Sequence, residues 1–223
     1  MSNPCLALLN SVLAVRLNPA SLEFVRRTQE QISTGVTDDR FTQLISLASR
    51  HIPRQPLEPG SEDISAAAQL IPGWNPKIWS LLETVRISFV LARRDLAAAD
   101  FADRFNQWFR FADEGETCAY YRALCLLPEP KQHLWRAAEG CRTNMRSVFA
   151  AVACDSPYPF LYFDDIAWNQ MLLKALFVGE PLANIYGADK RHNADLQAMV
   201  KDYVDERRSA GRDIPADVQL LLA

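Results

Sequence analysis

The chain has 223 residues, of which 49% are hydrophobic and 23% charged, and its formal net charge at pH 7 is −3. A chain of this length and composition can form a globular core without disulfides or a structural metal. Its slight negative charge provides no general attraction for nucleic acid or for an anionic membrane surface, so we expect no nucleic-acid partner.

The first predicted element is a helix that begins at the Asn3-Pro4 pair, which is a common helix start. It continues through an apolar run over residues 5–15. No basic residue precedes this run, as one normally does in a secretory signal, and the run is too short to cross a bilayer. We therefore favour a buried or amphipathic first helix over a signal peptide, and we expect a cytoplasmic protein without a transmembrane segment.

The cysteines and histidines give no sign of a disulfide framework or a metal site. The five cysteines are an odd number, and no two of them form a Cys-x-x-Cys pair. None of the three histidines belongs to a zinc-binding pattern such as His-Glu-x-x-His. We therefore expect a reduced protein that needs no metal and no cofactor.

Helix-start residues, glycines and prolines divide the rest of the chain into further helices. These cover about residues 20–33, 61–70, 75–92, 117–126, 131–153 and 189–209, and others begin near residues 37, 95, 164 and 215. No segment alternates apolar and polar residues as a strand does, and no Asn-Gly or Asp-Gly hairpin turn occurs. The sequence therefore predicts an all-α fold of about nine to eleven helices joined by short loops.

The strongest break in the chain is a proline-rich linker over residues 53–60. Residues 1–60 supply the N-terminal helices and this linker, but we expect one compact, irregular helical domain over residues 1–223. Successive helix pairs suggest solenoid-like stacking in the first half. No motif recurs at the fixed period of a true solenoid, however.

The stretch over residues 154–177 is the centre of the functional argument. It starts with Tyr158 between two prolines. The prolines either make a rigid connector or hold the tyrosine ring as the wall of a pocket. The Tyr158-Pro159 peptide bond can be cis. It continues as a helix that is apolar on almost every side, which predicts burial. Asn169, Gln170 and Lys174 lie inside this helix, and a buried polar group without a partner costs about 1–3 kcal/mol. They therefore either meet partners from other segments or line a cavity.

Polar residues also lie on apolar faces of the predicted helices on both sides of this stretch, and arginine forks among them match phosphate or carboxylate. The resulting set of predicted ligand-binding residues is Arg142, Asn144, Tyr158, Asn169, Gln170, Arg191, Asn193 and Arg207. The candidates for acid–base chemistry are Asp165, Lys174 and Glu206. Ion pairs on a solvated face, or a network that only specifies the core, are the structural alternatives.

Five segments of the second half resemble the core of the EboA family, namely EGCRTNM, SPYP, FDDIAWNQMLLKALF, GADKRHNADL and DERRSAGR. The resemblance covers residues 112–211, and the N-terminal half carries no matching motif. One departure is Ser156, which stands where the family pattern is expected to have asparagine before Pro-Tyr-Pro. Serine caps such a turn almost as well. No catalytic residues are established for the family, so none can be carried over.

The resemblance implies a part in making or moving a small specialised metabolite. EboA proteins are usually encoded beside other Ebo proteins that resemble a sugar-cyclising enzyme, a prenyltransferase, a hydrolase and a sugar-phosphate isomerase. The implied ligand is a sugar phosphate, a cyclitol or a prenylated product. The predicted polar residues would bind it between three helices, those of Arg142, of residues 169–174 and of residues 193–207. The alternative is a non-enzymatic scaffold for those Ebo proteins, which would expose an apolar patch on the aromatic 101–111 segment or on the first helix. Whether the protein is an enzyme stays open.

Overall fold

The computed structural model describes residues 3–222, and within them the chain forms twelve α-helices, five short 3₁₀ helices and no β-strand, which confirms the predicted all-α fold. The α-helices are α1 (Pro4–Arg16), α2 (Pro19–Thr34), α3 (Asp38–Leu47), α4 (Ser61–Leu70), α5 (Leu81–Leu91), α6 (Phe101–Trp108), α7 (Glu114–Ala123), α8 (Leu134–Arg142), α9 (Arg146–Ala153), α10 (Tyr158–Tyr162), α11 (Asp165–Val178) and α12 (Ala194–Ser209). The 3₁₀ helices are η1 (Ala48–Arg50), η2 (Leu124–Leu126), η3 (Pro130–His133), η4 (Leu182–Asn184) and η5 (Ala216–Leu221). None of the helices in this part of the chain is both long and apolar enough to cross a membrane.

Side-chain caps start most of the helices whose beginnings the sequence predicts. The Asn3 side chain accepts hydrogen bonds from two free N–H groups of α1, and Asn18 and Thr37 each accept one at the starts of α2 and α3. Asp164 caps α11 in the same way. These caps satisfy N–H groups that have no partner within the helix, which is why a cap residue predicts a helix start.

Two helices begin later than the sequence predicts. The helix expected from residue 75 begins at Leu81, because Ser80 and Glu83 form a capping box there. The helix expected from residue 189 begins at Ala194, where Asn193 accepts a hydrogen bond from the Leu196 N–H at 2.8 Å. In both cases the observed capping residue lies four or five positions beyond the predicted start of the helix.

The single helix predicted over residues 131–153 is divided into η3, α8 and α9. Thr143 ends α8 with an extended backbone, and its hydroxyl accepts a hydrogen bond from the Met145 N–H at 3.1 Å. A threonine that bonds the backbone nearby offers an alternative to the helical hydrogen bond. The break lets α9 pack against α8 and leaves Arg142 at the C-terminal end of α8.

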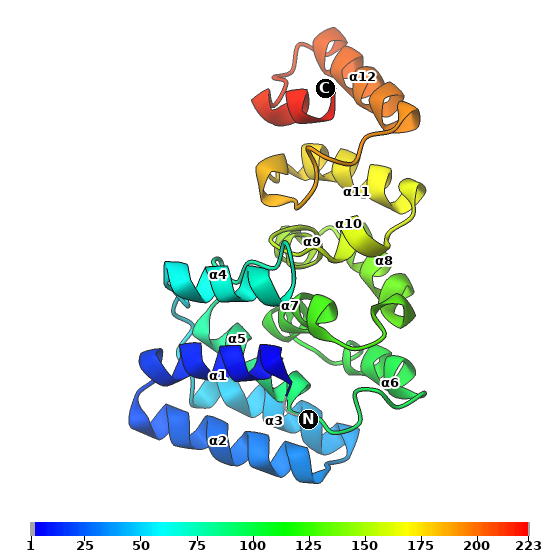
Figure 1. Cartoon of the computed structure of the whole chain (residues 1–223). Coiled ribbons are helices and arrows are strands. Elements are labelled where there is room, and N and C mark those ends of the chain that lie inside the picture. The colour runs from blue at the N-terminus through cyan, green and yellow to red at the C-terminus, as the bar shows by residue number, and fades with distance from the viewer. Residues whose placement is uncertain (1–2, 223) are drawn as a thin grey trace.

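The helices are stacked along one direction, from α1–α5 near the N-terminus to α12 near the C-terminus (Figure 1). Nearly every residue of α5 is buried, and this helix contacts α1, α2 and α7. Further along the stack, α7 contacts α9, α9 contacts α8 and α10, and α11 contacts α12. Each layer therefore packs mainly on the layers next to it.

The position of α11 in this stack corrects the prediction that the helix is buried on all sides. Trp168 and Leu172 are buried, but Ile166 and Phe177 are 70% and 64% exposed. A helix in a stack is covered by the layers above and below it and stays open at its side (Figure 1). Its open side therefore exposes two large apolar side chains.

A cluster of aromatic rings fills the layer that contains α6 and α7. Phe105 lies with its ring centroid 5.1–6.0 Å from those of Phe101, Trp108, Tyr120 and His133. Burial among these rings lowers the pKa of His133 to about 4, because the charged imidazolium is poorly solvated there. The His133 imidazole is therefore neutral at pH 7.

Candidate functional site

Three of the predicted site residues lie around one hollow of about 260 Å³ between α8 and α11. We call it the α8–α11 hollow. It is lined by Ala138, Cys141, Arg142, Phe163, Ala167, Gln170, Met171 and Lys174. Its lining combines apolar side chains with an amide and two cations, so it can hold a molecule that has both an apolar and a polar or anionic part.

Lys174 is half-buried in this hollow and takes no carboxylate partner among the described residues. Its ammonium group donates a hydrogen bond to the carbonyl oxygen of Thr143 and lies 5.9 Å from the centroid of the Phe149 ring. A carbonyl and an aromatic face stabilise an ammonium group without cancelling its charge. The charge of Lys174 therefore stays available to an anion.

The other two polar residues lie at the opening of the hollow. The Arg142 side chain is 64% exposed and forms an ion pair with Glu139, one turn earlier in α8. Gln170 is exposed on α11. An exposed ion pair of this kind contributes at most about 1 kcal/mol, so a ligand can displace Glu139 from Arg142 at little cost.

Cys141 is the only thiol in the lining of the α8–α11 hollow, and it is not a nucleophile at neutral pH. Burial raises the pKa of the Cys141 thiol to about 12. Because the thiolate is the reactive form of cysteine, a thiol with so high a pKa is chemically inert. Among residues 3–222 no group of three or more histidine, cysteine, aspartate or glutamate side chains is placed to hold a metal ion.

Asn169 and Asn193 form a pair of their own, away from the lining of the hollow. The amide of each donates a hydrogen bond to the side-chain oxygen of the other, at 2.9 Å in both directions. Asn169 is only 4% exposed, and Asn193 also caps α12. The pair therefore satisfies its own buried polar groups and fastens α11 to α12.

The remaining predicted residues are distributed over separate places. Arg191 donates to the Phe160 carbonyl oxygen at 3.1 Å and to the Asp165 carboxylate at 2.7 Å. Glu206 pairs with Arg212 on the exposed side of α12, and Arg207 donates to the Asp213 carbonyl oxygen. These contacts are local ion pairs and caps, and they do not join the hollow.

Tyr158 and Asn144 also lie outside the lining of the hollow. Tyr158 is buried, and its hydroxyl donates to the carbonyl oxygen of Pro130. No cis peptide bond occurs in the part of the chain that the structure describes, so the Tyr158-Pro159 bond is trans. Asn144 is exposed in the connection between α8 and α9. The structure thus brings together Arg142, Gln170 and Lys174 from the predicted set.

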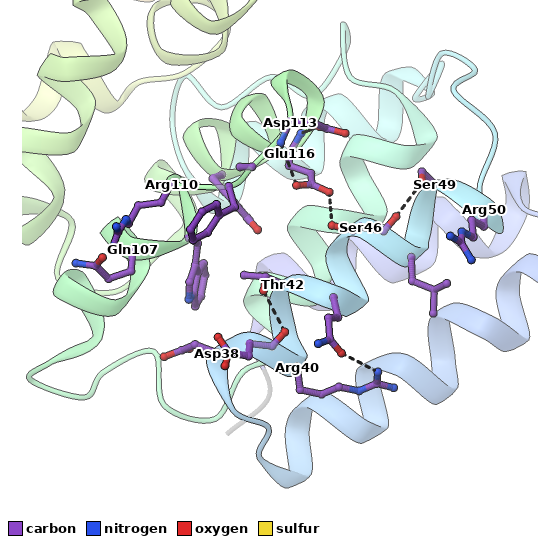
Figure 2. Close-up of a pocket in the computed structure, with 17 residues that line it drawn as sticks. Asp38, Arg40, Thr42, Ser46, Ser49, Arg50, Gln107, Arg110, Asp113 and Glu116 are labelled. Carbon is purple, nitrogen blue, oxygen red and sulfur yellow. Dashed lines mark hydrogen bonds between the residues drawn. The ribbon is translucent and has the colours of Figure 1, made fainter.

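A larger hollow, of about 870 Å³, lies in the N-terminal half, where the sequence predicted no site (Figure 2). We call it the α3–α7 groove, because one side is α3 with η1 and the other is the segment from α6 into α7. Its lining contains the side chains of Asp38, Asp39, Arg40, Thr42, Gln43, Ser46, Leu47, Ser49, Arg50, Gln107, Trp108, Arg110, Phe111, Ala112, Asp113, Glu116 and Tyr120. In α3 these residues have the pattern of an ordinary solvated helix face, so the sequence alone does not indicate a site here.

A buried ion pair lies beneath this groove. The Arg86 side chain is 2% exposed, and it donates to the Glu116 carboxylate at 3.3 Å and to the Ile45 carbonyl oxygen at 3.2 Å. Ser46 donates to the same carboxylate at 2.7 Å, and the two residues point toward one another in Figure 2. Arg86 thus joins α5 to both sides of the groove.

A family model described as "Metabolite traffic protein EboA" matches residues 5–222 of the chain. The match includes the N-terminal half, in which the sequence segments alone gave no resemblance. Among curated proteins and solved structures, none matches the chain.

Proposed function

This chain belongs to the EboA family, whose model is described as a metabolite traffic protein, and we propose that it binds a small amphipathic metabolite reversibly in the α8–α11 hollow. Arg142, Gln170 and Lys174 would receive the polar or anionic part of the ligand. The observation that carries the proposal is the pairing of an apolar lining with a half-buried lysine that no carboxylate neutralises in the described part of the chain.

The size of the hollow supports a carrier that covers only part of its ligand. Pockets that enclose a drug-sized molecule usually measure about 300–1,000 Å³, whereas this one measures about 260 Å³. A ligand larger than this would protrude over the exposed apolar side of α11, where Ile166 and Phe177 lie. Of a sugar phosphate, a cyclitol and a prenylated product, the last agrees best with such a surface.

The arrangement of titratable groups supports binding rather than acid–base catalysis. Asp165 is engaged by Arg191, and Glu206 is engaged by Arg212, so neither carboxylate lies in the hollow with Lys174. General acid–base catalysis needs a donor or acceptor within hydrogen-bond reach of the reacting group. We therefore propose transport or delivery of the metabolite, with no chemical step at this site.

The test is a titration with the fluorescent dye anilinonaphthalene sulfonate, which is itself an amphipathic anion. In the Ala167→Trp variant the indole fills the hollow, and we expect dye binding there to be lost. Lys174→Gln should weaken binding about fivefold, the equivalent of about 1 kcal/mol for one partly exposed charge.

Two variants serve as matched controls for this titration. Ala68→Trp adds an exposed indole on α4, and Lys201→Gln removes an exposed charge from α12. Both should bind the dye as the unmodified chain does, and all four variants should keep its melting temperature. Equal dye binding by Ala167→Trp and by the unmodified chain would contradict the proposal.

The second candidate function is a non-enzymatic scaffold for neighbouring Ebo proteins, and the exposed apolar side of α11 is the observation that favours it. The aromatic segment that the sequence favoured for such a patch is mostly buried, since Phe101, Phe105 and Trp108 belong to the core. Co-purification with an Ebo protein that is lost on Phe177→Ser would support the scaffold. A chain that stays monomeric beside those proteins and binds the dye would count against it.

A further inference from the structure

We propose that the α3–α7 groove is a second ligand site, which takes a small organic anion carrying a phosphate or carboxylate group on an apolar or aromatic body. The groove shares no lining residue with the α8–α11 hollow, and the proposal does not depend on what that hollow binds. It rests on which of the charges around the groove already have partners.

Most of the acidic side chains around the groove are engaged by the protein itself. Glu116 accepts hydrogen bonds from Arg86, from the Ser46 hydroxyl and from the Asp113 N–H. Asp38 pairs with Arg93 at 3.1 Å and with Arg104 at 3.5 Å. Both carboxylates are thus paired with the protein's own arginines, although Oδ1 of Asp38 has no hydrogen-bond partner in the part of the chain that the structure describes.

Asp113 is engaged as well. Its side chain accepts a hydrogen bond from the Glu116 N–H at 2.7 Å as the N-cap of α7, and it lies 3.7 Å from the Arg86 guanidinium. Of the four carboxylates in the lining, this leaves Asp39 as the one without an ion-pair partner in residues 3–222. Arg86 is a single cation shared by Asp113 and Glu116, so these three side chains together keep one net negative charge.

The basic side chains that line the groove, in contrast, have no carboxylate partner among the described residues. Arg40, Arg50 and Arg110 are exposed, and none of them has a carboxylate partner within the described part of the chain. Arg40 donates only to the neutral amide of Gln43, at 3.3 Å, and Arg110 lies 5.7 Å from the ring of Phe111. Three guanidinium groups without an ion pair among the described residues are therefore available to an anion.

Figure 2 shows how these arginines are distributed. Arg110 comes from the α6–α7 side of the groove, whereas Arg40 and Arg50 come from opposite ends of α3 with η1. The three guanidinium groups therefore stand at separate places around the margin of the groove. Planar forks of this kind are suited to the oxygen atoms of phosphate and carboxylate.

An aromatic surface at the edge of the groove defines the other half of the ligand. Phe111 is 91% exposed beside Arg110, while Trp108 and Tyr120 are buried in the lining. A ring or short apolar chain on the ligand would cover Phe111 while its anionic group meets Arg110. The volume of about 870 Å³ is within the range of about 300–1,000 Å³ that small-molecule sites occupy.

Isothermal titration calorimetry with phenyl phosphate, benzoate and the neutral benzyl alcohol tests the proposal on the full chain. We expect at least one of the anions to bind, and to bind more tightly than benzyl alcohol. Arg110→Gln should weaken anion binding about fivefold, and the triple variant R40Q/R50Q/R110Q about a hundredfold, if each exposed charge contributes as surface charges usually do. Because all three positions are exposed, the melting temperature should not change.

Arg208→Gln is the matched control, since Arg208 is an exposed arginine of α12 at the far end of the stack (Figure 1). It should bind the anions as the unmodified chain does. The same titration in Ala167→Trp excludes binding in the α8–α11 hollow, and we expect it to be unchanged. The proposal is overturned if neither anion binds, if the triple variant binds as well as the unmodified chain, or if Ala167→Trp alone abolishes binding.

Discussion

Replacing Arg86 with methionine tests whether the buried ion pair holds the α3–α7 groove together. The Arg86 side chain is 2% exposed and that of Glu116 is 8% exposed. Arg86 bonds the Ile45 carbonyl oxygen from α3 and the Glu116 carboxylate from α7, so it joins three helices. Methionine keeps much of the side-chain length and apolar volume but removes the charge and both hydrogen bonds.

The expected loss in the free energy of unfolding is about 3–5 kcal/mol, because removing one partner of a buried pair leaves the other charge without compensation. We expect the lower end of this range. The Glu116 carboxylate would still accept hydrogen bonds from the Ser46 hydroxyl at 2.7 Å and from the Asp113 N–H at 3.1 Å. In the double variant R86M/E116Q no uncompensated charge remains, so we expect recovery of about 1–3 kcal/mol.

Urea unfolding followed by the helical circular dichroism signal gives the free energies for this double-mutant cycle. Arg26→Met is the control, because Arg26 forms an exposed ion pair with Glu23 on α2, and we expect it to cost at most about 0.5 kcal/mol. A loss below about 1 kcal/mol for Arg86→Met, or strictly additive losses in the cycle, would refute the coupling that the geometry implies.

Three further predictions concern burial elsewhere. The pKa of His133 is 6.5 in the unfolded chain and about 4 in the folded chain. The free energy of unfolding should therefore fall by up to about 3 kcal/mol as the pH drops from 6.5 to 4. In urea titrations His133→Phe should reduce this pH dependence. Gly140→Ala should lower the melting temperature, because a Cβ would lie 2.6 Å from Val152 and overpacking costs about 1–3 kcal/mol, whereas Gly60→Ala should not. Asn169→Leu should cost about 1–3 kcal/mol in chemical unfolding by leaving the Asn193 amide unpaired, yet leave dye binding intact; a loss of dye binding at unchanged stability would place Asn169 in the site.

The sequence was most informative where structure is decided within a few residues. Asn3, Asn18 and Thr37 announce helix starts because a cap acts on N–H groups two or three positions ahead. The break at Thr143 was not predicted, although it also depends on one local hydrogen bond. A single hydroxyl bond to the Met145 N–H is enough to end α8, and an uninterrupted apolar pattern does not reveal it.

The site could be predicted only in part from the sequence. Polar residues on an apolar helix indicate that each requires a hydrogen-bond or ion-pair partner, but they do not identify that partner. Asn169 forms hydrogen bonds with Asn193, and Lys174 donates to the Thr143 carbonyl oxygen and lies over the Phe149 ring. All three partners lie in other segments of the chain, so only the three-dimensional arrangement identifies them. The sequence did not predict the α3–α7 groove. Arg40 and Arg50 have the pattern of ordinary exposed helix residues, and only the fold places the α6–α7 segment opposite them.

The stacking of the helices bears on whether the two hollows can act on one another. In a stack where each layer contacts mainly its neighbours, a substitution at one level leaves distant levels in place. A route between the levels nevertheless exists, because the ring of Tyr120 in the groove lies 5.3 Å from that of Phe109, which lies 4.8 Å from Tyr121. Tyr121 in turn packs against Gly140 of α8. Other residues of α8 line the α8–α11 hollow. An anion in the groove and a ligand in the hollow can therefore influence one another through this contact, and Gly140→Ala is the substitution that would change it.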